Sequence, residues 1–199
     1  MLEYENNLYK KGIKYICGID EVGRGPLYGP VVACAIVMKK GYFNSEVDDS
    51  KKLSEKKRES LYDEILENCE SYGIGVVSAK EIDKINILEA TKKAMYIALS
   101  KLDEVDHILI DAVKLDKLNI PSTSIIKGDS KSFSIACASI IAKVYRDRIL
   151  KKDNKKYSEY GFDKNKGYGT KKHIEAIKKY GVLKEHRKSF KPVSLYVKN

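Results

Sequence analysis

The chain has 199 residues, 43% of them hydrophobic, which is enough for one large domain, or a domain with a small appendage, around a sizeable core. It has no run of 18 apolar residues, and its first residues lack the charged start and apolar stretch of a signal peptide. These features exclude a membrane-spanning helix and predict a cytoplasmic protein. The four cysteines lie far apart, without the Cys-x-x-Cys spacing of zinc sites, so we expect structural thiols.

The formal net charge of +10 is concentrated near the end of the chain. Residues 143–199 contain 18 Lys and Arg against 6 Asp and Glu, whereas residues 1–142 contain 20 against 22. A basic segment of this kind attracts phosphodiester backbones. Taken alone, the charge fits a lysine-rich soluble surface equally well.

Hydrophobic patterning predicts alternating strands and helices, which indicates an α/β protein with a mixed sheet. In chain order we expect a strand at 13–20, a glycine and proline loop at 22–30, a strand at 31–38, a helix from Ser54 to about Cys69 and a strand at 72–77. One or two helices over 82–102, strands at 107–111 and 123–127, a helix over 133–150, a loop at 161–169 and a helix from Thr170 to Gly181 follow. The tail after Gly181 is expected to be irregular.

Four acidic residues stand where a predicted strand ends or a turn begins, namely Asp20, Glu21, Asp111 and Asp129. Carboxylates at strand ends can converge on one point above a sheet, where they repel one another unless a cation lies between them. Oxygen ligands suit the hard cations Mg²⁺ and Mn²⁺. Taken singly, each acid is also an ordinary turn former. Because side chains alternate along a strand, Asp20 and Glu21 can meet one metal site only if the strand ends or bulges there.

Several polar residues near these acids could contact a nucleic acid. Gly23-Arg24-Gly25 follows the acid pair after Val22, and its glycines can expose the backbone to a close ligand. Lys51 precedes a helix and could meet phosphate. Ser139 and Lys143 share one face of an apolar helix. Tyr168 stands between lysines and could stack on a sugar or base, or simply pack in a turn.

Together these segments resemble bacterial ribonuclease HII over nearly the whole chain. The resemblance rests on Gly18–Val32, Asp49–Ser54, Glu81–Ala90, Leu109–Asp111, Lys127–Asp129, Ala138–Asp147, Tyr160–Thr170 and Ser189–Val193. It implies an α/β, RNase H-like fold with helices flanking the mixed sheet and a small C-terminal helical extension. We therefore expect a catalytic domain at residues 1–152 and a basic extension at 153–199 packed on it.

The resemblance also implies an activity and a set of site residues. The activity is hydrolysis of the RNA strand of RNA–DNA hybrids and cleavage on the 5′ side of single ribonucleotides in duplex DNA, leaving 3′-hydroxyl and 5′-phosphate ends. Two metal ions, Mg²⁺ or Mn²⁺, would take part. By position, the metal-binding carboxylates are Asp20, Glu21, Asp111 and Asp129, the ribonucleotide-sensing loop is Gly23, Arg24 and Gly25, and Tyr168 lies beside the ribose. The departures from the family pattern are Asn165, Lys191 and Tyr28.

Two other classes of protein remain as alternatives. Ribonuclease HIII resembles this chain in its catalytic domain but usually carries an N-terminal domain, whereas only about a dozen residues precede the first predicted strand. A non-catalytic nucleic-acid-binding module would keep the basic tail but has no use for four convergent acids, which repel phosphate. The expected partners are RNA–DNA hybrid and ribonucleotide-containing DNA, with no membrane association and a monomeric state.

Overall fold

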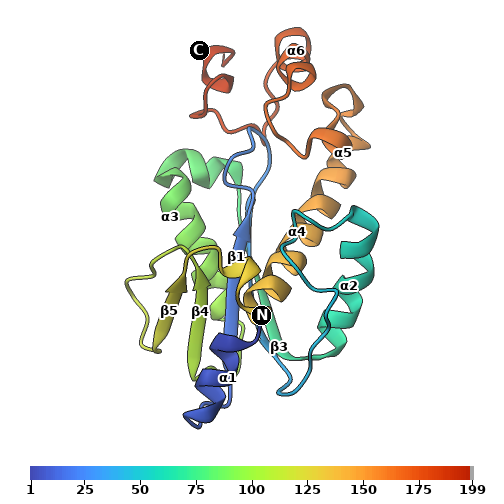
Figure 1. Ribbon diagram of the computed structural model, residues 1–199. Coiled ribbons are helices and arrows are strands. Elements are labelled where there is room, and N and C mark those ends of the chain that lie inside the picture. The colour runs from blue at the N-terminus through green and yellow to red at the C-terminus, as the bar shows by residue number, and fades with distance from the viewer. Residues whose placement is uncertain (198–199) are drawn as a thin grey trace.

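The computed structural model describes residues 1–197, and its centre is a five-stranded sheet with helices on both faces (Figure 1). The strands are β1 (Ile16–Val22), β2 (Val31–Met38), β3 (Cys69–Val77), β4 (His107–Asp111) and β5 (Ser122–Ile125). They lie in the order β3-β2-β1-β4-β5. The β1–β2 and β2–β3 pairs are antiparallel, and the β1–β4 and β4–β5 pairs are parallel, so the expected mixed sheet is confirmed.

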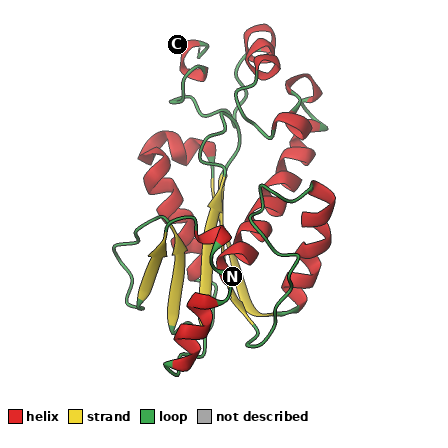
Figure 2. Ribbon diagram, viewed as in Figure 1, coloured by secondary structure: helices red, strands yellow, loops and turns green. Residues whose placement is uncertain are grey.

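The predicted helices are all present, and two further helices accompany them (Figure 2). The α-helices are α1 (Glu3–Lys10), α2 (Glu55–Glu67), α3 (Ala79–Leu99), α4 (Phe133–Asn154), α5 (Phe162–Asn165) and α6 (Lys171–Tyr180), and the 3₁₀ turns are η1 (Gly128–Ser130), η2 (Ser158–Tyr160) and η3 (Val193–Leu195). Neither α1 nor the short α5 was expected from the sequence. Helix α1 is fixed by a tertiary contact, because buried Glu5 accepts hydrogen bonds from the Ser132 hydroxyl at 2.6 Å and the Ser134 N–H at 3.0 Å.

Long helical segments cover both faces of the sheet, and α3 is divided by a kink at Asn86, where φ is +66°. Helix α3 packs on one face, and α4, backed by α2, packs on the other. Helix α4 can approach β1 closely because Gly18 has no side chain, and a Cβ at this position would overlap the backbone of Ser134. Within residues 1–197, no helix is both long enough and apolar enough to cross a membrane.

The C-terminal segment lies beyond the end of the sheet toward which β1 runs, against the loop that follows β1 (Figure 1). Tyr28 from this loop stacks on Phe162 with a ring-centroid distance of 3.9 Å, and its hydroxyl donates to Asp153 at 3.1 Å. Buried Leu150 and Val193 belong to the same apolar cluster. Residues 182–197 are irregular apart from η3, as expected, and Val193 packs them against the loop cluster. Tyr28, a departure from the family pattern, is a core residue.

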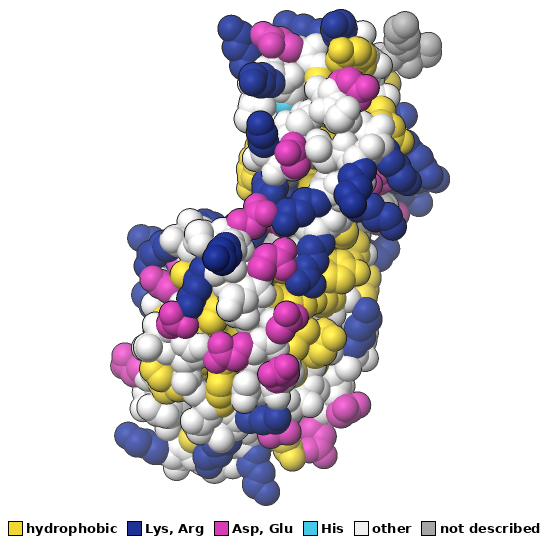
Figure 3. Space-filling view, turned by 90° about the vertical axis from the view of Figure 1, so that its right-hand side faces the viewer, with side chains coloured by type: hydrophobic (Ala, Val, Ile, Leu, Met, Phe, Trp, Pro, Cys, Tyr) yellow, Lys and Arg dark blue, Asp and Glu magenta, His cyan; other side chains and the backbone are white. Residues whose placement is uncertain are grey.

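Lys and Arg side chains gather around this C-terminal part on the face shown in Figure 3, whereas around the sheet they alternate with Asp and Glu. This arrangement agrees with the charge imbalance of the sequence. The division at residues 152 and 153 remains a prediction, and α4 continues through it to Asn154.

Gly18→Ala should destabilise the protein, because the new methyl group must push α4 away from β1. Overpacking of this kind costs about 1–3 kcal/mol. The free energy of unfolding, measured by urea denaturation, should fall by at least that amount. Gly25→Ala is the control, since a Cβ there meets only Tyr168, at 3.4 Å. Equal stability of the Gly18→Ala variant and the parent would show that the helix does not rest on this glycine.

Candidate active site

Parallel pairing brings the predicted acids to one end of the sheet. The β1–β4 register ends with Ile19 opposite Ile110, so Asp20 and Asp111 are the next residues of their strands. Strand β5 ends at Ile125, and η1 then places Asp129 beside them. The carboxyl ends of parallel strands meet at one sheet edge, which is why residues distant in sequence become neighbours here.

Each of the four carboxylates has a protein partner. Asp20 accepts from the N–H of Glu21 at 2.7 Å, and Asp111 accepts from the N–H of Gly128 at 2.7 Å. Two side-chain cations reach the other two acids. Arg24 Nη1 lies 3.4 Å from Glu21 Oε1, and Lys51 Nζ lies 3.2 Å from Asp129 Oδ2. The second oxygen of Glu21, Oε2, is buried and has no partner within residues 1–197.

Burial and mutual repulsion disfavour negative charge at this site. Burial, followed by the charge of Glu21, holds the pKa of Asp20 well above its usual value, although the Ser139 hydroxyl lowers it. Burial also raises the pKa of Glu21 and of Asp111, and Asp129 raises that of Asp111 further. Oxygen donors with this excess of negative charge, including one without a partner, fit a hard divalent cation.

The condition for Asp20 and Glu21 to share a metal through their side chains is not met in this structure. Strand β1 neither ends nor bulges at the acids, as was required, but pairs regularly with β2 through Val22. Alternation alone would send Glu21 to the face opposite Asp20. The charge of Glu21 nevertheless raises the pKa of Asp20, and that of Asp111 raises the pKa of Glu21, so the three carboxylates lie close enough to interact. Within residues 1–197, no three His, Cys, Asp or Glu side chains are arranged as a ready metal site. The four-carboxylate site therefore remains a prediction.

The loop after the acids has one buried glycine and one exposed glycine, with different roles. Gly23 has a φ of +95°, and a Cβ there would overlap Arg146 and lie 2.8 Å from the Pro30 carbonyl oxygen. The fold itself therefore requires this glycine. Gly25 is exposed and faces the ring of Tyr168, which is 48% exposed. Gly25 and Tyr168 thus form one accessible surface beside the acids.

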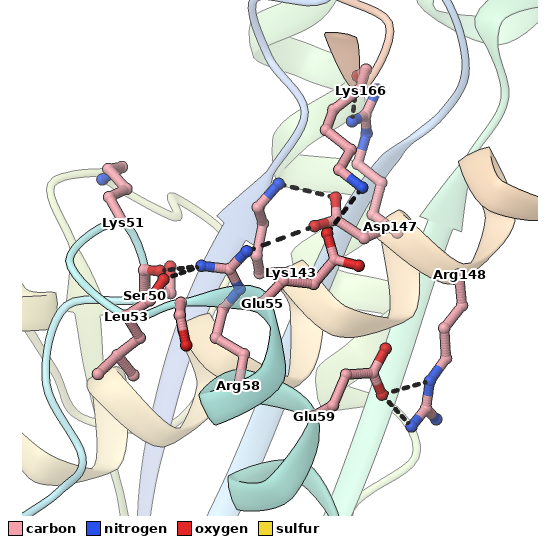
Figure 4. Close-up of polar contacts among 12 residues, drawn as sticks. Ser50, Lys51, Leu53, Glu55, Arg58, Glu59, Lys143, Asp147, Arg148 and Lys166 are labelled. Atoms are coloured by element: carbon pink, nitrogen blue, oxygen red, sulfur yellow. Dashed lines mark hydrogen bonds and ion pairs between the residues drawn. The ribbon is translucent and has the colours of Figure 1, made fainter. Parts of the chain in front are cut away.

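A polar network on α4 holds the segment that carries Lys51 (Figure 4). The Ser50 and Ser139 hydroxyls are 2.9 Å apart, and Arg58 donates to the Ser50 carbonyl at 2.8 Å. Lys143 donates to Asp147 at 2.7 Å. Asp147 is thus paired with a basic residue, and Ser139, on an apolar helix, has a polar partner.

Two buried arginines near the loop were missed in the sequence, where they looked like part of the basic surface. Arg146 of α4 donates to the carbonyls of Pro30, Tyr28 and Lys166 at 3.0, 2.9 and 2.9 Å. Arg187 donates to the carbonyls of Gly29 at 3.0 Å and Arg24 at 2.8 Å, and also to that of Gly23. Burial lowers the pKa of Arg146 to about 10 and that of Arg187 to about 9, so both stay charged at neutral pH.

A buried histidine pair lies next to Tyr168 and was also missed, because its spacing matches no metal motif. The Nε2 atoms of His173 and His186 are 3.0 Å apart. The Leu183 N–H donates to His186 Nδ1 at 2.8 Å, so this nitrogen carries no proton. His173 Nδ1 lies 2.8 Å from the Tyr168 carbonyl oxygen, which can only accept, so this nitrogen carries one. A neutral His186 then donates from Nε2 to His173.

The fold is similar to that of solved nucleases. Ribonuclease H2 from Pyrococcus horikoshii OT3 matches with a TM-score of 0.78 and 28% identity, over 91% of this chain and 96% of that chain. A chain from the PCNA:RNase HII complex of Archaeoglobus fulgidus matches with a TM-score of 0.75 and 26% identity, over 92% and 98%. The fold and the acids at the end of its sheet thus define a nuclease of the ribonuclease H class.

Sequence comparison narrows the class. The family model described as Ribonuclease HII matches residues 17–193. Ribonuclease HII of Bacillus cytotoxicus is 56% identical over 200 residues, covering 100% of this chain and 77% of that protein. Ribonuclease HII of Bacillus cereus strain B4264 is 58% identical over 194 residues, covering 97% and 75%. The chain belongs to the ribonuclease HII family and is an endoribonuclease of ribonuclease H type 2.

Acid should destabilise the protein through His186. Burial, followed by the neighbouring His173, lowers its pKa from 6.5 to about 3. Below pH 6.5 the unfolded chain therefore binds a proton that the folded protein excludes, and the stability present above pH 6.5 is lost as the pH falls toward 3. In His186→Gln this loss is absent. The difference in unfolding free energy between parent and variant should shrink by about 2 kcal/mol from pH 7 to pH 5. A pH-independent difference in urea titrations would contradict the neutral pair.

Proposed function

We propose that the chain hydrolyses the RNA strand of RNA–DNA hybrids and cuts duplex DNA on the 5′ side of a single embedded ribonucleotide. The products carry 3′-hydroxyl and 5′-phosphate ends. The observation that supports this most is the position of Gly25 and Tyr168, which form an accessible surface on the loop that follows Asp20 and Glu21 at the end of the sheet. An assay on labelled duplex DNA with one ribonucleotide, in Mg²⁺ and in Mn²⁺, tests the proposal.

Asp20, Glu21, Asp111 and Asp129 are the proposed ligands of Mg²⁺ or Mn²⁺. Their support is the oxygen donor set, the raised pKa values of three of them and the unpartnered Glu21 Oε2. A pair of such cations supplies an activated water and stabilises charge on the leaving oxygen during an in-line displacement. The Ser139 hydroxyl favours the charged form of Asp20 by lowering its pKa, and the Gly128 N–H orients Asp111.

Lys51 and Arg24 are the proposed phosphate contacts at the site. Each now lies against a carboxylate, and the Lys51 side chain is 78% exposed. Their partners, Asp129 and Glu21, are needed for the metals. When the carboxylates turn to a cation, the two basic side chains are released toward a substrate phosphate. Lys51 is kept nearby by the network that holds Ser50.

Selection of the ribonucleotide is proposed to come from the loop and Tyr168. DNA lacks the 2′-hydroxyl, so polar groups built to bind that hydroxyl stay unpaired when DNA occupies the site. Tyr168 would pack on the ribose, and the backbone at Gly25 would contact its hydroxyl. The Lys- and Arg-rich C-terminal part would hold the flanking phosphates as a salt-dependent surface. The protein is proposed to act as a monomer, without a membrane.

Asp20→Asn and Asp129→Asn should each reduce cleavage about a hundredfold or more, because losing a metal ligand removes several kcal/mol of transition-state stabilisation. Asp20→Asn should also raise the Tm measured in EDTA, since a charge disfavoured by burial is removed. Exposed Asp103→Asn is the matched control and should cleave like the parent. Near-parent turnover by either site variant in Mg²⁺ or Mn²⁺ would refute the assigned ligands.

Tyr168→Ala should lower the rate of cleavage at a single ribonucleotide about tenfold or more, because stacking contacts with a nucleotide contribute about 1–3 kcal/mol. Tyr168→Phe keeps the ring and isolates the contribution of the hydroxyl. Tyr180→Ala removes a similarly exposed tyrosine of the C-terminal part and serves as the control. Rates are compared at matched folded fraction. A folded Tyr168→Ala variant that cuts as fast as the parent would exclude a role in recognising the ribose.

A further inference from the structure

Arg187 determines how the peptide groups of the loop are oriented. It is fully buried, and its guanidinium donates to the carbonyl oxygens of Gly23, Arg24 and Gly29. In a trans peptide the N–H points away from the carbonyl. The N–H groups of Arg24 and Gly25, which share peptide planes with the first two carbonyls, therefore point away from Arg187. Neither N–H has a protein acceptor within residues 1–197.

These two N–H groups are donors without a protein acceptor in the described part of the chain, and they lie on the exposed loop whose Gly25 borders Tyr168. Gly25 is the exposed glycine that faces the Tyr168 ring. The buried charge of Arg187 is hydrogen-bonded to the carbonyls of these two peptide planes and polarises them, which strengthens both N–H donors. Without Arg187, nothing else in the described structure binds the carbonyls of Gly23 and Arg24.

His186, the residue before Arg187, is linked through His173 to Tyr168, the other part of this surface. His186 donates to His173, and His173 donates to the carbonyl of Tyr168. This chain is buried and ends on the Tyr168 backbone. The backbone N–H of Tyr168 donates to Asn165, so its peptide groups are held from both sides while its ring stays accessible.

Asp83 fixes the position of this segment from the opposite face of the sheet. It lies in the first part of α3 and accepts from the N–H groups of Lys188 and Ser189 at 2.8 and 2.9 Å and from the Ser189 hydroxyl at 2.6 Å. The Arg187 guanidinium also lies over the ring of Phe190, 5.1 Å from its centroid. The segment 186–189 is thus anchored to α3 and reaches into the loop.

We propose that His186 and Arg187, anchored through Asp83, are positioning residues that set the two halves of the ribose-recognising surface relative to each other. The inference rests on the proposed recognition of the ribose by the loop and Tyr168. Arg187 orients the donors at Arg24 and Gly25, and His186 orients Tyr168. Neither residue touches the substrate, so their loss acts on turnover through the loop and leaves binding of the phosphate backbone in place.

The test compares kcat and KM on duplex DNA with one ribonucleotide for Arg187→Lys, which keeps the charge but not the planar fork. We expect kcat to fall about tenfold or more, with KM within threefold of the parent, at a temperature where circular dichroism shows the variant to be folded. Val193→Ala is the matched control, since it truncates a buried side chain of the C-terminal segment that donates no hydrogen bond to the loop, and its kcat should equal that of the parent.

Asp83→Ala is a second variant for the case in which Arg187→Lys does not fold. It removes a surface anchor, so it should fold, and it should lower kcat in the same direction by a smaller factor. A double variant with Gly25→Ala supplies a further readout. If Arg187 acts through the loop, adding Arg187→Lys to Gly25→Ala should change kcat by less than it does in the parent.

The outcomes separate this inference from the proposed function. Suppose that Tyr168→Ala is impaired. A parent-like kcat in folded Arg187→Lys then overturns the positioning role. If Arg187→Lys does not fold, a parent-like kcat in Asp83→Ala overturns it instead. Fully additive effects in the double variant also overturn it. If Tyr168→Ala itself is parent-like, recognition of the ribose at this surface fails, and the positioning role fails with it.

Discussion

The contact between α4 and β1 at Gly18 is the constraint on which the remaining structure depends. The missing side chain lets the helix backbone rest directly on the strand. From that position, Ser139 reaches Asp20 one turn further along the helix, and Arg146 reaches the loop after β1. A helix seated a few ångströms higher would lose both contacts. Gly18 therefore sets how closely α4, with Arg146, approaches the acids of β1 and the loop that follows them.

The site combines two kinds of charge that are stabilised in different ways. The carboxylates repel one another and are partly offset by Arg24 and Lys51 at the surface. Arg146 and Arg187 are buried, yet their hydrogen bonds go to backbone carbonyls and not to carboxylates. Burying a charge is costly unless hydrogen bonds compensate it, and here peptide oxygens provide that compensation. The loop is consequently held where it follows the acids, and the N–H groups of Arg24 and Gly25 point away from Arg187.

The pattern of apolar residues predicted most helices and strands correctly, because it reflects which side chains are buried. Strand 31–38 agrees with β2, and Ser54 and Thr170 cap the helices that they were expected to begin. The predicted end of the first strand was wrong. The prediction stopped at residue 20, but β1 continues to Val22 because its antiparallel pairing with β2 extends beyond its pairing with β4. The extra two residues of β1 place Glu21 inside the strand. This extension follows from the pairing of β1 with β2, which the local sequence does not reveal. Helix α1 and the burial of Arg187 likewise depend on contacts more than 100 residues away in sequence.

The hydrogen bonds of Arg187 to Gly23 and Arg24 span 164 and 163 residues. A ribosome that adds about 5–20 residues per second needs roughly 8–30 s to make that stretch. During this time the acids at the end of β1 are already synthesised, but the loop beside them has no guanidinium to fold around. A nascent chain that has not yet reached Arg187 therefore lacks the guanidinium that binds the carbonyls of Gly23 and Arg24. The order of these peptide groups thus depends on a residue that is made long after the loop itself.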